Sequence, residues 1–165
     1  MTAIEIRQVD YGNPEEVNDL CTLLNTYAMD PQGGGKAIDE SVLAKLPQQL
    51  SEFPVAVSFL VYVDGQPAAL ANCFFGFSTF AGQRLLNIHD LAVQADFRGR
   101  GLSQKLLQHI EAFARDHHCC KLTLEVLDRN SVAMNAYRKF GFEGYELDPA
   151  AGKAVFWQKK LASPS

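Results

Sequence analysis

The segment LAVQADFRGRGLSQKLL, residues 91–107, constrains the fold more than any other part of the chain. A strand pattern ends at Val93, and a pattern with the apolar spacing of a helix starts after Gly101. The loop between them contains two glycines, which let a ligand approach the backbone closely because they carry no Cβ. The first N–H groups of a helix are unpaired and attract anions. The segment therefore predicts a strand–loop–helix unit that suits a phosphate or pyrophosphate, or else a tight turn without a ligand.

Two arginines in this loop, Arg98 and Arg100, would add positive charge where a polyphosphate would lie. Two other phosphate-binding motifs fit the sequence less well. The P-loop of nucleotide-binding proteins needs Gly–Lys–Ser/Thr, which does not occur in the chain. The dinucleotide motif GxGxxG lacks its third glycine here. The loop is therefore either an anion site of another kind or a tight turn without a ligand.

The rest of the chain predicts a mixed α/β domain. The expected strands are 3–9, 55–63, 67–77, 84–93, 121–126, 142–145 and 154–159. One helix is expected to start at Pro14, directly after the capping residue Asn13. Three more helices are expected over 39–50, 101–117 and 130–140. No repeat or change of composition marks an internal boundary. We therefore expect a single domain over residues 1–160 and a flexible tail over 161–165.

Composition and charge exclude several classes of function. The chain has 165 residues, is 47% apolar and carries a formal net charge of −4, which suits one globular domain and argues against nucleic acid as a partner. The longest apolar run, residues 53–63, is shorter than the roughly 20 residues of a membrane helix. The N-terminus has no signal-peptide pattern. Four cysteines without CxxC spacing favour a cytoplasmic location and predict no metal site.

A second segment, NSVAMNAYRKFGF at residues 130–142, follows the first after one predicted helix and one predicted strand. Together the two segments resemble the signatures of the GNAT superfamily of acyl-CoA-dependent N-acetyltransferases. The signature R/Q-x-x-G-x-G/A is matched by Arg98, Gly101 and, as a mild departure, Ser103. The signature N-x-x-A-x-x-x-Y-x-x-x-G-F is matched by Asn130, Ala133, Tyr137, Gly141 and Phe142. The resemblance implies a GNAT-like fold, with a mostly antiparallel sheet of about seven strands, splayed at the cofactor site, and about four flanking helices.

The resemblance also implies acetyl-CoA as the acyl donor, without a metal. In the family the pantetheine pairs with the exposed backbone of a splayed strand, and the pyrophosphate lies on the backbone of the glycine loop. Asn130 would contact the pantetheine or fix the loop that follows, or serve only as a helix cap. The expected cofactor-binding residues are Leu91, Ala92, Val93, Arg98, Gly99, Arg100, Gly101, Leu102, Ser103, Asn130 and Tyr137.

The resemblance assigns a catalytic acid and leaves the base open. Tyr137 would protonate the thiolate of departing CoA, unless it only packs on the core. His89 and Asp90 are the candidates for the base. Histidine side chains ordinarily titrate near neutrality, and His89 occupies a place where some family members carry a glutamate, although it would also fit as a histidine bonded within the sheet. Asp90 matches a common neighbouring acidic residue, and could instead hold a loop or orient the amine.

Alternation along strand 84–93 predicts which side chains share a face. One face would carry Asn87, His89 and Leu91, and the other would carry Ile88, Asp90 and Ala92. A β-bulge in this strand would change the assignment.

The acceptor site is expected in the variable early part of the chain and in the loop after the third strand. Its candidate residues are Tyr27, Asp30, Ser78, Thr79, Phe80 and His89. The implied function is an acyltransferase that moves an acetyl group directly from the CoA thioester to the primary amine of a small molecule. A protein or peptide N-acetyltransferase and a CoA-binding sensor without turnover are the alternatives. Dimers are common in the family, so a homodimer is a further expectation.

Overall fold

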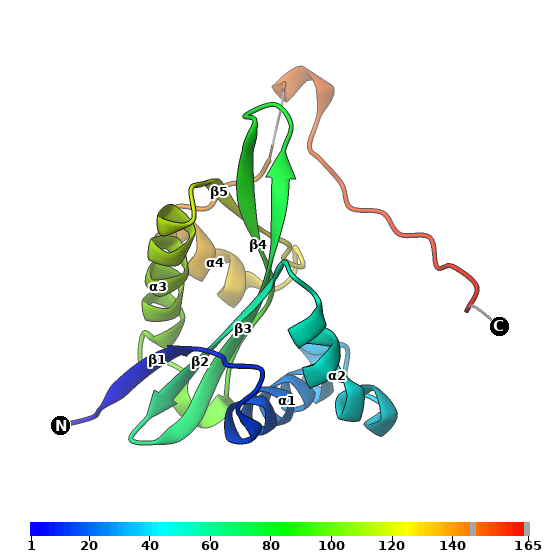
Figure 1. The fold of residues 1–165 in the computed structure, drawn as a ribbon. Helices are drawn as coiled ribbons and strands as arrows, with labels where there is room; N and C mark the ends of the chain where they lie inside the picture. Colours follow the sequence, from blue (N-terminus) through cyan, green and yellow to red (C-terminus); the bar gives the residue numbers. More distant parts are fainter. Residues whose placement is uncertain (146–147, 164–165) are drawn as a thin grey trace.

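The computed structural model describes residues 1–145 and 148–163, which form a mixed α/β fold (Figure 1). Its strands are β1 (Ile4–Gln8), β2 (Ala56–Val63), β3 (Gln66–Ser78), β4 (Gln83–Val93) and β5 (Cys119–Leu124). Its α-helices are α1 (Pro14–Met29), α2 (Glu40–Glu52), α3 (Leu102–Asp116) and α4 (Ser131–Phe140). Every element that the sequence predicts up to residue 140 is therefore confirmed, with small shifts at the ends.

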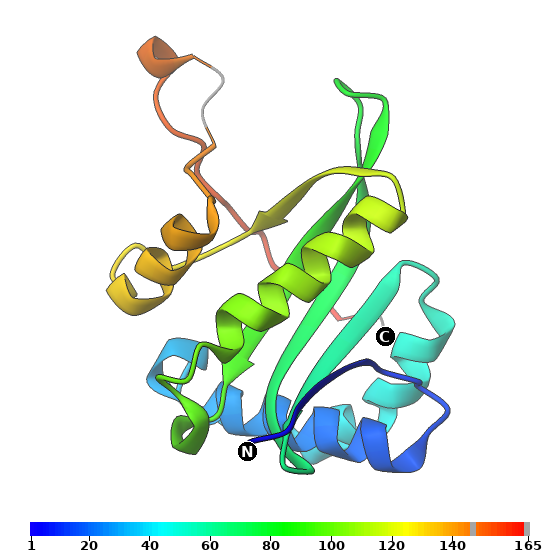
Figure 2. The ribbon, with the colours of Figure 1, turned by 90° about the vertical axis from the view of Figure 1, so that its left-hand side faces the viewer.

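The five strands of the described residues form one sheet in the order β1-β2-β3-β4-β5. The first four are antiparallel neighbours, and β5 runs parallel to β4. A parallel neighbour needs a long crossover connection, which α3 supplies by lying across one face of the sheet (Figure 2).

Helices cover both faces of the sheet. Residues of α3 pack with β2 residues such as Phe59 and Val61 on one face. Residues of α1 and α2 pack with Leu60 and Tyr62 on the other. This arrangement explains the longest apolar run of the sequence, because β2 is buried on both faces from Val57 onward. None of the helices in the described ranges is long and apolar enough to cross a membrane.

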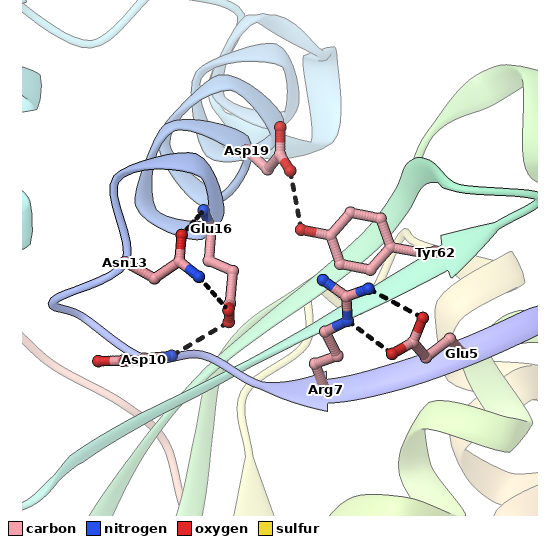
Figure 3. Close-up of polar contacts among 7 residues, drawn as sticks. All are labelled: Glu5, Arg7, Asp10, Asn13, Glu16, Asp19 and Tyr62. Atoms are coloured by element: carbon pink, nitrogen blue, oxygen red, sulfur yellow. Dashed lines mark hydrogen bonds and ion pairs between the residues drawn. The ribbon is translucent and has the colours of Figure 1, made fainter.

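Polar contacts fix the first half of α1 to the sheet (Figure 3). Asn13 Oδ1 accepts the N–H groups of Glu15 at 3.0 Å and Glu16 at 3.2 Å, so Asn13 caps the helix as predicted. The Tyr62 hydroxyl on β2 donates to Asp19 Oδ2 at 2.8 Å. Burial, and then the bond to Asp19, raises the pKa of the Tyr62 phenol above its ordinary value. These contacts hold α1 in place, and its C-terminal end reaches the candidate site described below.

The two last predicted strands, 142–145 and 154–159, are absent from the described residues, so the expectation of about seven strands is wrong in this respect. A single backbone hydrogen bond joins the two segments, from the Ala154 N–H to the Tyr145 C=O at 3.4 Å. Strand-forming residues favour an extended backbone, but a strand also needs a ladder to a neighbour. The sequence pattern showed the first property and contained no information on the second.

The C-terminal segment is consequently exposed (Figure 1). Val155, Phe156 and Trp157 are 74–84% accessible to solvent, and β5 pairs with β4 alone in the described part of the chain. Residues 161–163 of the predicted tail have no regular secondary structure, and residues 164 and 165 lie outside the described residues.

Candidate active site

The candidate site lies where β4 and β5 diverge. The ladder between them ends at Ile88 and Leu124, although β4 continues to Val93. Near the end of the ladder, Asn87 Nδ2 donates to Thr123 Oγ1 at 3.0 Å. Beyond this point the backbone groups of β4 that face β5 have no strand partner on that side among residues 1–145 and 148–163. Such groups can pair with the amides of a ligand.

A cavity of about 440 Å³ lies beside the end of β4. Its walls come from the C-terminal end of α1 and the turn after it, from β4, from the loop before α3, and from α4. The predicted cofactor-binding residues that line it are Leu91, Ala92, Val93, Arg98, Gly99, Gly101, Leu102, Ser103, Asn130 and Tyr137. Tyr27 and Asp30, which the sequence placed at the acceptor, line the same cavity. The fold thus brings three distant segments of the chain, residues 27–32, 91–103 and 130–137, to one space.

The loop before α3 turns its backbone toward this cavity. Gly99 and Gly101 have φ angles of +76° and +74°, in the left-handed region that favours glycine. Gly101 is the N-cap of α3 and, having no side chain, makes no capping hydrogen bond to the first turn. A Cβ at Gly101 would meet no protein atom within 4 Å, so the φ angle and not the available space requires glycine here. The open N–H groups at this helix start suit an anion.

Arg98 lies at the edge of the cavity and pairs with Asp30. Its Nε donates to the Val93 carbonyl at 3.1 Å, and its Nη2 lies 3.4 Å from Asp30 Oδ2. The N–H of Gln32, and then Arg98, hold the pKa of Asp30 below its usual range. Asp30 therefore lies at the glycine loop, where it pairs with a candidate anion-binding arginine.

Helix α4 contributes Tyr137 and Asn130. Burial raises the pKa of the Tyr137 phenol, with a smaller raise from Tyr27, so the phenol keeps its proton near neutral pH and can donate it. The Tyr137 ring also packs edge-to-face on Phe142, with ring centroids 5.8 Å apart. Asn130 Oδ1 accepts the Ala133 N–H at 3.2 Å, so Asn130 caps α4 and lines the cavity as well.

A β-bulge in β4 changes the predicted faces of this strand. Asn72 on β3 lies opposite Asp90, and the residue after Asn72 lies opposite Ile88, so His89 is an extra residue in the ladder. Beyond the bulge the alternation is shifted by one residue. Ile88 and Leu91 therefore pack in the same core, and the prediction that placed them on opposite faces is wrong.

Neither candidate base lines the cavity in the described structure. Asp90 Oδ2 accepts the Asn72 side-chain amide at 3.0 Å. Burial, and then the negative charge of Asp90, raises the pKa of Tyr27, so Asp90 lies close to a residue that lines the cavity. His89 is exposed and packs edge-to-face on Phe74, with centroids 5.6 Å apart.

Other predicted residues do not line the cavity. Arg100 Nη2 donates to the Asp96 carbonyl at 3.2 Å, and its guanidinium lies over the Phe97 ring. Ser78 is the last residue of β3, and Thr79 and Phe80 belong to the turn between β3 and β4, at the end of β4 that is farther from Leu91 (Figure 1). At about 3.4 Å per residue, the part of β4 from residue 83 to residue 91 spans roughly 27 Å. This separation argues against their contact with a small acceptor at the cavity.

Several residues of the site were missed by the sequence interpretation. Gln32, Phe97, Val132 and Ala136 line the cavity. Val132 and Ala136 are four residues apart on α4, so helical spacing around the second motif would have found them. Asn72 is the one polar side chain within the run AALANCFF, a signal of an internal hydrogen bond that the pattern contained.

Residues 21–142 match the model of the Acetyltransferase (GNAT) family. The matched segment makes up most of the chain and contains every cavity residue named above. The chain belongs to the GNAT family.

This GNAT protein is similar to two groups of curated acetyltransferases. It is 38% identical over 90 residues to the streptothricin acetyltransferase of Streptomyces lavendulae, covering 54% of this chain and 46% of that protein. It is 31% identical over 94 residues to the thialysine N-epsilon-acetyltransferase of Bos taurus, covering 48% and 55%. The chain thus spans about half the length of these relatives.

Among solved structures, an aminoglycoside N-acetyltransferase in complex with CoA has a TM-score of 0.74 to this GNAT protein. The match covers 98% of this chain and 97% of that one, at 15% sequence identity. This likeness shows a shared fold. In residues 1–145 and 148–163 no group of three or more His, Cys, Asp or Glu side chains is arranged to hold a metal ion.

Proposed function

We propose that this GNAT protein transfers an acetyl group from acetyl-CoA to the primary amine of a small molecule. The observation that carries the proposal is the set of groups that line one cavity. The open helix start at Gly101, the unpaired end of β4 and the Tyr137 phenol all face the same space. These are an anion site, a backbone edge and a proton donor, which acyl transfer from a CoA thioester needs together.

Acetyl-CoA, the usual acyl donor of the family, fits the chemistry of these walls. The N–H groups at the start of α3, with Arg98, would hold its pyrophosphate. The free backbone of β4 from residue 91 to 93 would pair with its pantetheine amides, and apolar side chains such as Leu102 and Val132 would surround its carbon chain. When bound, acetyl-CoA supplies an activated thioester. The relative of the same fold in complex with CoA supports this assignment.

In the proposed reaction one C–N bond forms and one C–S bond breaks. An alkylammonium has an ordinary pKa near 10.4, so the acceptor must first give a proton to a base, for which Asp90 and His89 are the candidates. The free amine then attacks the thioester carbon, and Tyr137 donates its proton to the departing sulfur. Loss of one further proton from the nitrogen gives the neutral amide and restores the Tyr137 phenol. A covalent enzyme intermediate is not required. Cys73 is unsuited as a nucleophile, since burial, and then Asp90, raises the pKa of its thiol to about 12.

We infer the acceptor class from the similar proteins and from charge. The names of the similar proteins point to small molecules, namely streptothricin, thialysine and aminoglycosides. The Asp90 carboxylate, close to Tyr27 at the cavity, would favour a cationic amine. The cytoplasmic location and the homodimer stay predictions from the sequence.

The test is a panel of polyamines, amino acids, aminoglycosides and peptides, scored by acetyl-dependent release of CoA. We expect turnover with small amines and acetyl-CoA binding by calorimetry. Turnover with peptides alone would favour the protein N-acetyltransferase. Binding of acetyl-CoA without release of CoA across the whole panel would contradict the proposal and favour a sensor.

A further inference from the structure

Two buried polar side chains lie in the apolar core between the sheet and α1. Ser58 on β2 is 1% exposed, and Asn72 on β3 is 4% exposed. Leu60 and Leu70, two residues along the same strands, belong to the apolar core on this face. Burial of a polar group costs free energy unless its hydrogen bonds are remade. In the described part of the chain no buried side-chain nitrogen or oxygen lacks a partner, so both residues are satisfied.

The partners form one row of hydrogen bonds that ends at Asp90. Ser58 Oγ donates to Asn72 Oδ1 at 2.6 Å, which uses the only hydroxyl hydrogen of Ser58. The Tyr11 hydroxyl must therefore be the donor in its 2.8 Å bond to Ser58 Oγ. Asn72 Nδ2 donates to Asp90 Oδ2 at 3.0 Å. Every donor in the row points toward Asp90.

The strand register decides which residue of β4 the row reaches. Ser58 lies opposite Asn72, and Asn72 lies opposite Asp90, so the three side chains cross the sheet side by side. The register on the other side of the bulge, if continued, would place His89 opposite Asn72. Because the bulge inserts one residue, Asp90 takes this position and His89 is displaced from the row.

Fold stability alone does not require this row. Apolar side chains of similar volume would fill the same positions without the cost of polar burial, and such exchanges are often neutral or stabilising. Among the described residues, Asn72 makes the only hydrogen bond to the Asp90 carboxylate, and it uses Oδ2. Oδ1 therefore remains for a ligand. The titratable groups near Asp90 are Tyr27 from α1, Cys73 from β3 and His89 from β4 itself.

We propose that Asn72 is a positioning residue, which fixes one oxygen of Asp90 so that the other oxygen receives the proton of the acceptor's ammonium group. In this step the ammonium becomes a free amine, and the Asp90 carboxylate becomes a carboxylic acid. The inference rests on the proposed function and deepens it, because it names Asp90 in place of His89 as the base. The Asn72 amide does not ionise near neutral pH, so the row holds Asp90 and does not conduct protons.

The test measures kcat and KM for an active amine across pH in Asn72 variants. Asn72→Leu keeps the branched shape of the side chain and removes the donor. We expect kcat/KM for the amine to fall by roughly 10- to 100-fold, because a misplaced base costs this much. Acetyl-CoA affinity, measured by calorimetry, should not change.

Asn72→Asp tests for a change that a purely structural role of Asn72 would not produce, namely a shift in the pH profile of kcat/KM. Two carboxylates this close share one proton, so the acid limb of the kcat/KM profile should move to higher pH by about one unit or more. Leu70→Ala is the matched control on the same strand and face. It should lower the free energy of unfolding and leave the acid limb in place.

Coupling to Asp90 gives a second, independent measure. In an Asp90→Asn background, Asn72→Leu should cause no further loss of kcat/KM, since the group it positions is no longer a base. Ser58→Ala removes the support behind Asn72 and should cause a smaller loss of the same kind. It also keeps the proposal testable if the Asn72 variants do not fold.

The outcomes separate this inference from the proposed function. Suppose that the wild-type protein acetylates an amine and that the Asn72 variants keep its kcat/KM and its pH profile. This result would overturn the inference and leave the proposed function in place. Additive losses in the double variant would do the same, as would a pH profile that responds to His89→Ala and not to Asp90→Asn. A wild-type protein that releases no CoA with any amine would overturn the proposed function, and the inference with it.

Discussion

At the scale of single residues, the phenol of Tyr137 combines two properties that a catalytic acid needs. The phenol lines the cavity, and burial raises its pKa. It therefore stays protonated at a pH at which free amine is also available. Tyr137→Phe keeps the ring that packs on Phe142 and removes only the proton. We expect turnover to fall by about 10²-fold or more, with acetyl-CoA affinity unchanged, as measured by steady-state kinetics and calorimetry.

Tyr145→Phe is the matched control for this substitution. Tyr145 is 56% exposed and lies outside the residues that line the cavity. It should keep wild-type turnover. Equal turnover rates in the Tyr137→Phe variant and the wild-type protein would assign proton donation to another group.

At the scale of elements, the junction of β4 and α3 depends on a left-handed backbone at Gly101. Gly101→Val forces a branched side chain into a φ of +74° and directs its Cβ into open space beside the helix start. We expect acetyl-CoA affinity to fall by at least 10-fold, because the N–H groups that face the pyrophosphate are moved and partly covered. Isothermal calorimetry measures the affinity.

Gly65→Val separates backbone strain from ligand binding. Gly65 lies in the turn between β2 and β3, has a φ of +81°, and also has no protein atom within 4 Å of a Cβ. The Gly65→Val substitution should lower the melting temperature, as Gly101→Val does, and leave acetyl-CoA affinity unchanged. A Gly101 variant that binds acetyl-CoA normally would contradict the placement of the pyrophosphate.

At the scale of the whole molecule, buried thiols and phenols predict how stability depends on pH. The pKa of Cys73 is raised from 9.0 to about 12, mainly by burial, and burial also raises the pKa of Tyr11 and Tyr137. Above about pH 9 the unfolded chain loses these protons first, so stability is complete below that pH and falls as pH rises toward 12.

Urea unfolding across the alkaline range measures this decline in the free energy of unfolding. Cys73→Ala should make it less steep, whereas Cys120→Ala, at an exposed thiol, should not. A free energy of unfolding that is constant up to about pH 11 would refute this account.

The exposed C-terminal segment predicts self-association. Phe156 and Trp157 are exposed, and an apolar patch of this kind favours contact with a second molecule. Trp157 is the only tryptophan of the chain, so its fluorescence reports on this segment alone. We expect the emission to shift to shorter wavelength and the mass from light scattering to rise with protein concentration. Phe156→Lys should weaken both effects, and Phe77→Lys, at another exposed site, should not. A monomer with solvated indole emission at every concentration would contradict this prediction.

The nine elements up to residue 140, the glycine loop and the place of Tyr137 on a helix could be read from the sequence. These features depend on local properties. Examples are the cap at Asn13, the helical spacing of α3 and the left-handed turn residues Gly101 and Gly141. Each involves neighbours within a few residues, so periodicity and turn chemistry are enough to predict it.

Only the tertiary structure decided how the strands meet. The register between β3 and β4 contains the bulge that brings Asp90 to Asn72 and displaces His89. The turn after α1 brings Asp30 to Arg98 of the glycine loop, and the length of β4 separates residues 78–80 from the cavity. The same dependence on a neighbour explains why residues 154–159, although rich in strand-forming side chains, lie outside the sheet. Pairing depends on the free energy of contacts between distant segments, and a pattern confined to one segment contains no information about its partner.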